Sequence, residues 1–168
     1  MMRTRGFSLI VVVLLLGVVA PACSSSTKSE SAAGSQGDGG GSGACPFSGS
    51  TQPQDQPGES APTTLTGASP QTDGCIDNVQ LKFSPSLAAS HFEYESDAPV
   101  LVVTLTGATL GGGLSAGTTQ NPKNLNYVQK LAVSTPSGNV KVEITLDQKR
   151  PFLVSSSKVP AELELSIG

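Results

Sequence analysis

Tryptophan is absent from the sequence and histidine occurs once, as His91. Without tryptophan the chain cannot build the Cys…Trp…Cys core of an immunoglobulin domain. A Ser-His-Asp hydrolase would have to use His91, and no Gly-x-Ser-x-Gly motif accompanies it. His91 alternates with apolar residues and shares its predicted face with Glu93, which indicates a solvated strand position. We therefore expect a protein that is not an enzyme.

Patterns for metals and cofactors are missing as well. Zinc needs about four ligands, and Cys45 and Cys75 with one distant histidine are too few. Glu93, Glu95 and Asp97 form a small acidic cluster, but calcium needs more oxygen ligands in a defined loop. The glycines at 111–113 lack the Gly-Lys-Ser/Thr ending of a phosphate loop. The sequence predicts no metal site and no cofactor.

Positive charge is scarce. The chain has 10 Lys and Arg against 13 Asp and Glu, a formal net charge of −3. Two of the arginines, Arg3 and Arg5, lie in a predicted leader, so the mature chain is more acidic than the whole sequence. An acidic chain with scattered lysines binds nucleic acid poorly and is not held on anionic lipid by its charge. We therefore expect no nucleic-acid partner.

Residues 1–22 have the pattern of a secretory signal peptide. Arg3 and Arg5 precede an apolar run from Phe7 to Ala20, which matches a basic region followed by a hydrophobic region. A helix of about 14 residues spans roughly 21 Å, less than the ~30 Å hydrocarbon core of a bilayer. The run therefore favours a cleaved signal over a permanent transmembrane anchor.

Cys23 follows a stretch of small residues, Ala20-Pro21-Ala22. This stretch resembles a lipobox, where the cysteine receives lipid and becomes the first mature residue. It is also an A-x-A site for ordinary signal peptidase, which would cut at the same place without lipidation. Lipid on Cys23 would leave an even number of cysteines, as expected outside the cytoplasm. We expect a chain bound to the membrane through lipid on Cys23, on the outer face of the cytoplasmic membrane.

Two segments of low hydrophobicity follow the signal. Residues 23–44 are rich in Gly and Ser and predict a disordered linker with a span of roughly 25 Å. Residues 45–75 are rich in Pro, Gly, Ser and Thr and predict an irregular segment with at most a short strand at 63–66. A disulfide between Cys45 and Cys75 would close it and stabilise the fold by roughly 3–4 kcal/mol. The alternative is two free thiols.

Residues 76–168 alternate between apolar and polar residues. This period of two, with many β-branched residues, predicts half-buried strands. Residues 107–117 are rich in glycine and predict a long loop. About seven short strands predict an all-β fold, an antiparallel β-sandwich. The predicted strands lie at 78–83, 92–95, 101–106, 127–134, 140–146, 152–156 and 162–167.

Three stretches carry a resemblance to a known family. They are CPFSGST at 45–51, GCIDNVQLKF at 74–83 and LDQKRPFLV at 146–154. They resemble the AMIN-like domain of exported actinobacterial lipoproteins, although Asn78 stands where that family usually has arginine. The resemblance implies a small, non-catalytic β-sandwich, and related AMIN domains direct proteins to peptidoglycan.

The last of these stretches holds the candidate binding residues Asp147, Arg150 and Phe152. One interpretation is a local ion pair between Asp147 and Arg150 that orders a turn. The other is a surface that holds glycan or peptide, with Phe152 as a platform. Our leading hypothesis is a lipid-anchored envelope protein whose sandwich binds cell-wall material, namely peptidoglycan. The alternative is a protein-interaction module that recruits an envelope protein through a sheet edge.

Overall fold

The computed structural model describes residues 46–59 and 62–168. The predictions for the signal peptide (1–22), Cys23, the linker (23–44) and Cys45 lie outside the described residues. No helix in the described ranges is long and apolar enough to cross a membrane.

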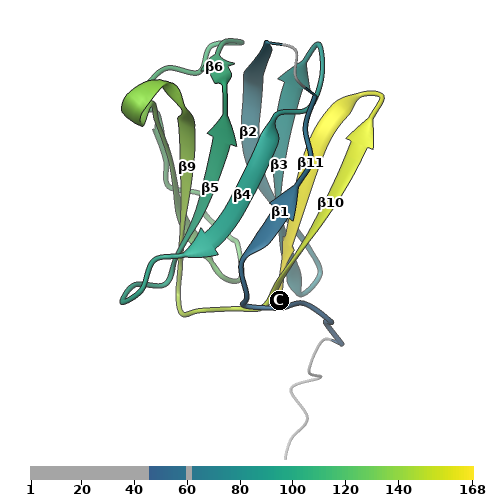
Figure 1. Ribbon diagram of the computed structural model, residues 1–168. Coiled ribbons are helices and arrows are strands. Elements are labelled where there is room, and N and C mark those ends of the chain that lie inside the picture. The colour runs from purple at the N-terminus through teal and green to yellow at the C-terminus, as the bar shows by residue number, and fades with distance from the viewer. Residues whose placement is uncertain (1–45, 60–61) are drawn as a thin grey trace, which may run out of the picture. The chain divides into compact units, whose positions relative to one another are not determined.

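The described residues form two β-sheets packed face to face, which confirms the all-β sandwich (Figure 1). The first sheet has the order β1-β4-β5-β9-β8-β7 and the second has the order β10-β11-β3-β2-β6. The strands are β1 (Gln54–Gln56), β2 (Thr63–Asp73), β3 (Ile76–Ser84), β4 (Ala89–Tyr94), β5 (Val100–Thr106), β6 (Ala108–Leu110), β7 (Thr119–Gln120), β8 (Val128–Ser134), β9 (Val140–Leu146), β10 (Phe152–Lys158) and β11 (Ala161–Ile167). All strand pairs are antiparallel except β2 with β6, which run parallel.

The core follows the alternation that the sequence predicts. Val79 and Leu81 of β3 are fully buried, as are Leu163 and Leu165 near them on β11. Burial of each such side chain contributes about 1.5–3 kcal/mol. Val102 is a buried residue that does not belong to the main core cluster, although only 4% of it is exposed. The sandwich is therefore held by the two inner faces, as period-two patterning requires.

The prediction of an irregular segment at 45–75 is wrong for 54–56 and 63–73, which form strands. They contribute β1 to the first sheet and the eleven-residue β2 to the second. Pro70 lies inside β2, where its missing N–H is tolerated because β6 pairs with β2 only at Thr63–Leu65. The carbonyl of Ala68, two residues earlier, accepts a hydrogen bond from the side chain of Gln120 on β7. The sandwich thus begins well before residue 76.

The glycine-rich loop at 107–117 is shorter than predicted because β6 lies within it. Gly111 N–H donates to the Leu65 carbonyl at 3.0 Å and continues the contact with β2. Gly112 has φ +62°, and a Cβ there would lie 2.2 Å from the Thr66 carbonyl oxygen. The glycine is therefore required by a close approach of two backbones.

Residues 50–59 cross one side of the sandwich, and we call them the strap (Figure 1). At one end Ser50 forms a backbone bridge with Phe152 of β10 in the second sheet. Gln54–Gln56 then pair with β4 in the first sheet. At the other end Glu59 N–H donates to the Leu87 carbonyl at 3.0 Å. The strap thus links the two sheet edges that the sandwich would otherwise leave apart.

Candidate functional site

The residues between β9 and β10, 147–151, form a turn at one end of the sandwich, and we call them the cationic turn. Asp147 accepts hydrogen bonds from Arg150 Nη2 at 2.7 Å and Arg150 Nε at 3.2 Å. The same carboxylate accepts the Gln148 N–H at 2.9 Å. The two-pronged guanidinium contact fixes the turn more firmly than a single surface pair would.

The electrostatics of the turn follow from this pair. The hydrogen bonds from the Arg150 guanidinium lower the pKa of Asp147. The Asp147 carboxylate in turn raises the pKa of Arg150, mainly through the same hydrogen bonds. Both groups are partly exposed, with side-chain exposures of 35% and 24%. They remain charged at neutral pH, and the turn keeps its shape there.

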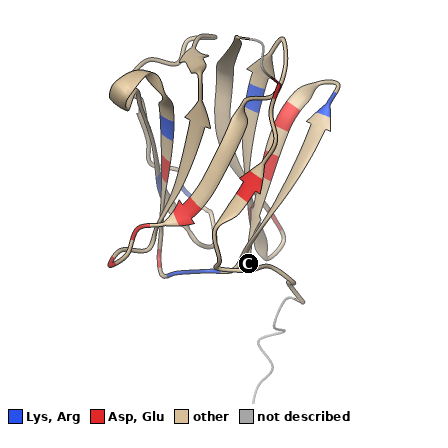
Figure 2. Ribbon diagram, in the orientation of Figure 1, with Lys and Arg blue, Asp and Glu red and all other residues tan. Residues whose placement is uncertain are grey.

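Two tyrosine rings lie beneath the two cations of the turn. Arg150 Cζ lies 4.2 Å from the centre of the Tyr127 ring, and Lys149 Nζ lies 5.8 Å from that of Tyr94. Lys149 also donates to the Ser96 carbonyl at 2.8 Å. Each cation is attracted to the negative face of the ring. Figure 2 shows the basic residues of this turn beside the C-terminus, where acidic residues occupy the neighbouring loop.

Tyr94 locks the turn to the first sheet. Its hydroxyl donates to the Arg150 carbonyl at 2.7 Å and accepts the Arg150 N–H at 3.1 Å. Burial raises the pKa of Tyr94, so the hydroxyl stays protonated and can donate. A main-chain position held by both its N–H and its carbonyl has little freedom. Of the residues in the turn, Arg150 is therefore the most firmly placed.

Phe152 belongs to the core, which contradicts the interpretation of this residue as a platform for a ligand. It is fully buried. Its ring centre lies 5.9 Å from that of Tyr94 in an edge-on arrangement and 6.5 Å from that of Phe92. The predicted site residues Asp147 and Arg150 do meet in the structure. Phe152 supports them from below through Tyr94 and offers no surface to a ligand.

Asp77, which sequence reasoning assigned no role, anchors the same end. It is fully buried and accepts backbone N–H groups from Asn126 at 3.0 Å, Tyr127 at 2.6 Å and Val128 at 2.9 Å. We call this contact the clasp, because it joins β3 of one sheet to β8 of the other. A sequence signal existed, since Asp77 is in phase with the buried Val79.

The side chains of the turn are suited to binding a ligand. The two cations of the turn can pair with carboxylates. His91 lies elsewhere, on β4, with Nδ1 2.7 Å from Asp55 and Nε2 3.5 Å from Glu93. In the described ranges, no hydroxyl or thiol forms a hydrogen bond with His91. Nor does any group of three or more His, Cys, Asp or Glu side chains there form a metal site.

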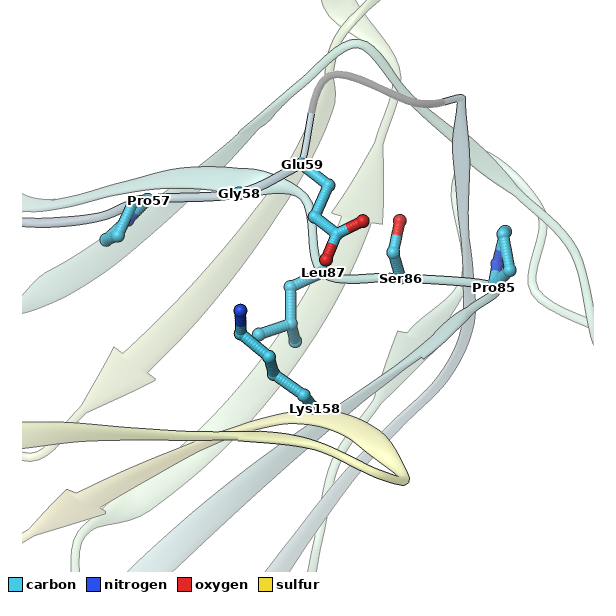
Figure 3. Close-up of a pocket in the computed structure, with 7 residues that line it drawn as sticks. All are labelled: Pro57, Gly58, Glu59, Pro85, Ser86, Leu87 and Lys158. Carbon is cyan, nitrogen blue, oxygen red and sulfur yellow. The ribbon is translucent and has the colours of Figure 1, made fainter. Parts of the chain in front are cut away.

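A cavity of about 240 Å³ lies beside the strap (Figure 3). Pro57, Gly58 and Glu59 of the strap form one wall. Residues 85–87, which lead from β3 to β4, form the floor, and Lys158 at the end of β10 closes the other side. Sequence reasoning missed this cavity, because its walls come from three separate parts of the chain and share no motif.

Comparison of the chain with protein-family models, curated proteins and solved structures finds no match. The AMIN-like assignment therefore stays a resemblance carried by the stretches given above. Cys75 is disulfide-bonded, and its predicted partner, Cys45, lies outside the described residues. The Cys45–Cys75 pairing stays a prediction.

Proposed function

We propose that this chain is an exported, lipid-anchored, non-catalytic envelope protein whose sandwich binds peptidoglycan through the cationic turn. The observation that carries the proposal is the placement of Lys149 and Arg150 over Tyr94 and Tyr127 at one end of the sandwich. Its AMIN-like resemblance supports the same ligand class.

Peptidoglycan suits such a surface on chemical grounds. Its peptides carry carboxylates, which pair with ammonium and guanidinium groups. Asp147 already engages the Arg150 guanidinium, so Lys149 is the freer of the two cations. Lys149 is therefore the residue expected to contact an anionic group of the wall.

Co-sedimentation with isolated peptidoglycan tests the proposal. The membrane-extracted protein is mixed with sacculi at low and moderate salt and pelleted. Lys149→Ala should weaken binding roughly 3–5-fold, because an exposed charge contact contributes up to about 1 kcal/mol. Lys82→Ala, which removes an exposed lysine on β3, is the matched control and should bind normally. Failure of the unaltered protein to pellet above a buffer control rules out wall binding.

Anchoring is tested separately by intact-mass analysis of the membrane-extracted protein. Lipidation at Cys23 predicts the mass of the chain from residue 23 plus a diacylglyceryl group. A mass equal to the unmodified chain from residue 23 supports ordinary secretion instead. Reduction should add two hydrogens if Cys45 and Cys75 are paired, and no mass change would contradict the pairing.

A second candidate is protein recruitment through the edge of β10. Among the described residues, Ser50 alone pairs with the outer edge of this strand, at Phe152. Leu153 on the same strand is 50% exposed, which suits the addition of a further strand. Cross-linking in cells followed by mass spectrometry distinguishes the candidates. One dominant protein partner without sacculus binding favours the edge.

A further inference from the structure

The cavity beside the strap contains two charged groups of opposite sign. Glu59 extends from the strap and Lys158 extends from the end of β10, and both side chains point into the cavity (Figure 3). No ion pair within 4 Å joins them, and neither has another ion-pair partner among the described residues. Among the described residues, the cavity thus offers an unpaired anion and an unpaired cation on opposite walls.

Backbone contacts join both charged residues to neighbouring parts of the folded sandwich. Glu59 is held by its N–H bond to the Leu87 carbonyl. Gly58 passes so close to β4 that a Cβ would lie 1.9 Å from the Ala89 nitrogen. Lys158 pairs with Ala161 at the closed end of the β10–β11 hairpin. In the folded protein these contacts hold the two walls in place before a ligand arrives, which lowers the cost of binding.

Size restricts the ligand. Pockets for drug-sized molecules are about 300–1,000 Å³, and this cavity is about 240 Å³. A disaccharide unit does not fit inside it, whereas one or two small amino-acid residues do. The floor includes Leu87, which is 6% exposed and belongs to the core. A short aliphatic group could therefore rest on the floor while charged ends meet the walls.

We propose that this cavity binds a small zwitterion, namely a free amino acid or a short peptide with both ends unblocked. The ligand ammonium pairs with Glu59, and the ligand carboxylate pairs with Lys158. The cavity is separate from the cationic turn, so this binding does not depend on the proposed recognition of peptidoglycan.

Ligand-observed saturation-transfer NMR on the membrane-extracted protein tests this proposal with alanyl-alanine as the probe. Binding is expected with a millimolar dissociation constant. Glu59→Gln and Lys158→Gln should each weaken it roughly 3–5-fold, as the loss of one exposed charge contact predicts. Glu164→Gln and Lys82→Gln remove charges from β11 and β3 away from the cavity. These two controls should leave the dissociation constant unchanged.

Blocked probes assign each charge to its wall. Acetylation of the probe's amine should weaken its binding to the unaltered protein. The Glu59→Gln variant should bind the acetylated probe as well as it binds the free dipeptide. The Lys158→Gln variant should likewise bind the amidated probe as well as it binds the free dipeptide. Equal binding of the doubly blocked dipeptide, or no binding of the zwitterion up to about 100 mM, would overturn the proposal. Either result leaves the sacculus experiment unaffected.

Discussion

The turn end of the sandwich and the strap both connect one sheet to the other, but they do so by different means. At the turn end, the clasp uses the fully buried Asp77 and three backbone N–H groups. The strap relies on a bridge at Ser50, on three residues of β1 and on the pair between Asp55 and His91. The Asp55 side chain is 82% exposed, so water competes for that pair.

This difference bears on what each region can bind. Tyr127 belongs to both the clasp and the turn, because its N–H donates to Asp77 and its ring lies beneath Arg150. The turn is therefore preorganised by a buried contact, which suits recognition of a rigid polymer. The strap has a cavity beneath it and fewer buried polar contacts, so it belongs to the less stable part of the fold.

Phe152 should give the largest effect. It supports Tyr94 from below and bridges to Ser50, so it serves both regions. Phe152→Ala should lower the free energy of unfolding by about 3–5 kcal/mol, measured by urea denaturation. Leu153→Ala, next to it but half exposed, should cost much less. Similar losses in the free energy of unfolding for the two variants would contradict the burial of Phe152.

Asp77→Ala tests the clasp itself. The substitution leaves three N–H groups without their acceptor, at a cost of about 3 kcal/mol. It should also weaken peptidoglycan binding, because Tyr127 loses its anchor. Asp73→Ala, an exposed carboxylate at the end of β2, is the control, with an expected change within about 0.5 kcal/mol. An Asp77 variant as stable as this control would disprove the clasp.

The sequence predicts the sandwich well and the site only in part. Alternation identifies β3, β9 and β11, because each has one buried face and one more exposed face. It fails for β2, whose Pro and Gly residues are typical of loops and are tolerated at an edge. Pairing of Asp147 with Arg150 follows from their spacing, whereas Tyr94 and Tyr127 join them through tertiary packing. Burial of Phe152 does not follow from alternation, because Phe152, Leu153 and Val154 are consecutive apolar residues and leave the inner face of β10 undefined.

Gly58→Ala measures how firmly the strap is held. The added methyl group overlaps the backbone at Ala88 and Ala89, so the strap must shift. We expect a loss of about 1–3 kcal/mol in unfolding free energy, as for overpacking. Binding of alanyl-alanine should fall, while sacculus binding should not change. Loss of sacculus binding in this variant would mean that strap and turn are coupled.

His91 should give the smallest effect, and that effect depends on pH. Its hydrogen bond to Asp55 raises the pKa of His91 above 6.5. The stabilisation is therefore fully present below pH 6.5 and is lost as the pH rises through the raised pKa. For so exposed a pair it amounts to about 0–1 kcal/mol. The urea midpoint should therefore fall slightly as the pH rises from 5 to 8. His91→Gln should remove this dependence on pH.

Hydrogen exchange with and without added peptidoglycan tests the central claim most directly. In the membrane-extracted protein alone, the Tyr127 and Val128 amides should exchange far more slowly than those of β1. Added peptidoglycan should slow exchange at the cationic turn and leave β10 beyond Phe152 unchanged. Slower exchange along β10 with no change at the turn would contradict the account and favour recruitment through the sheet edge.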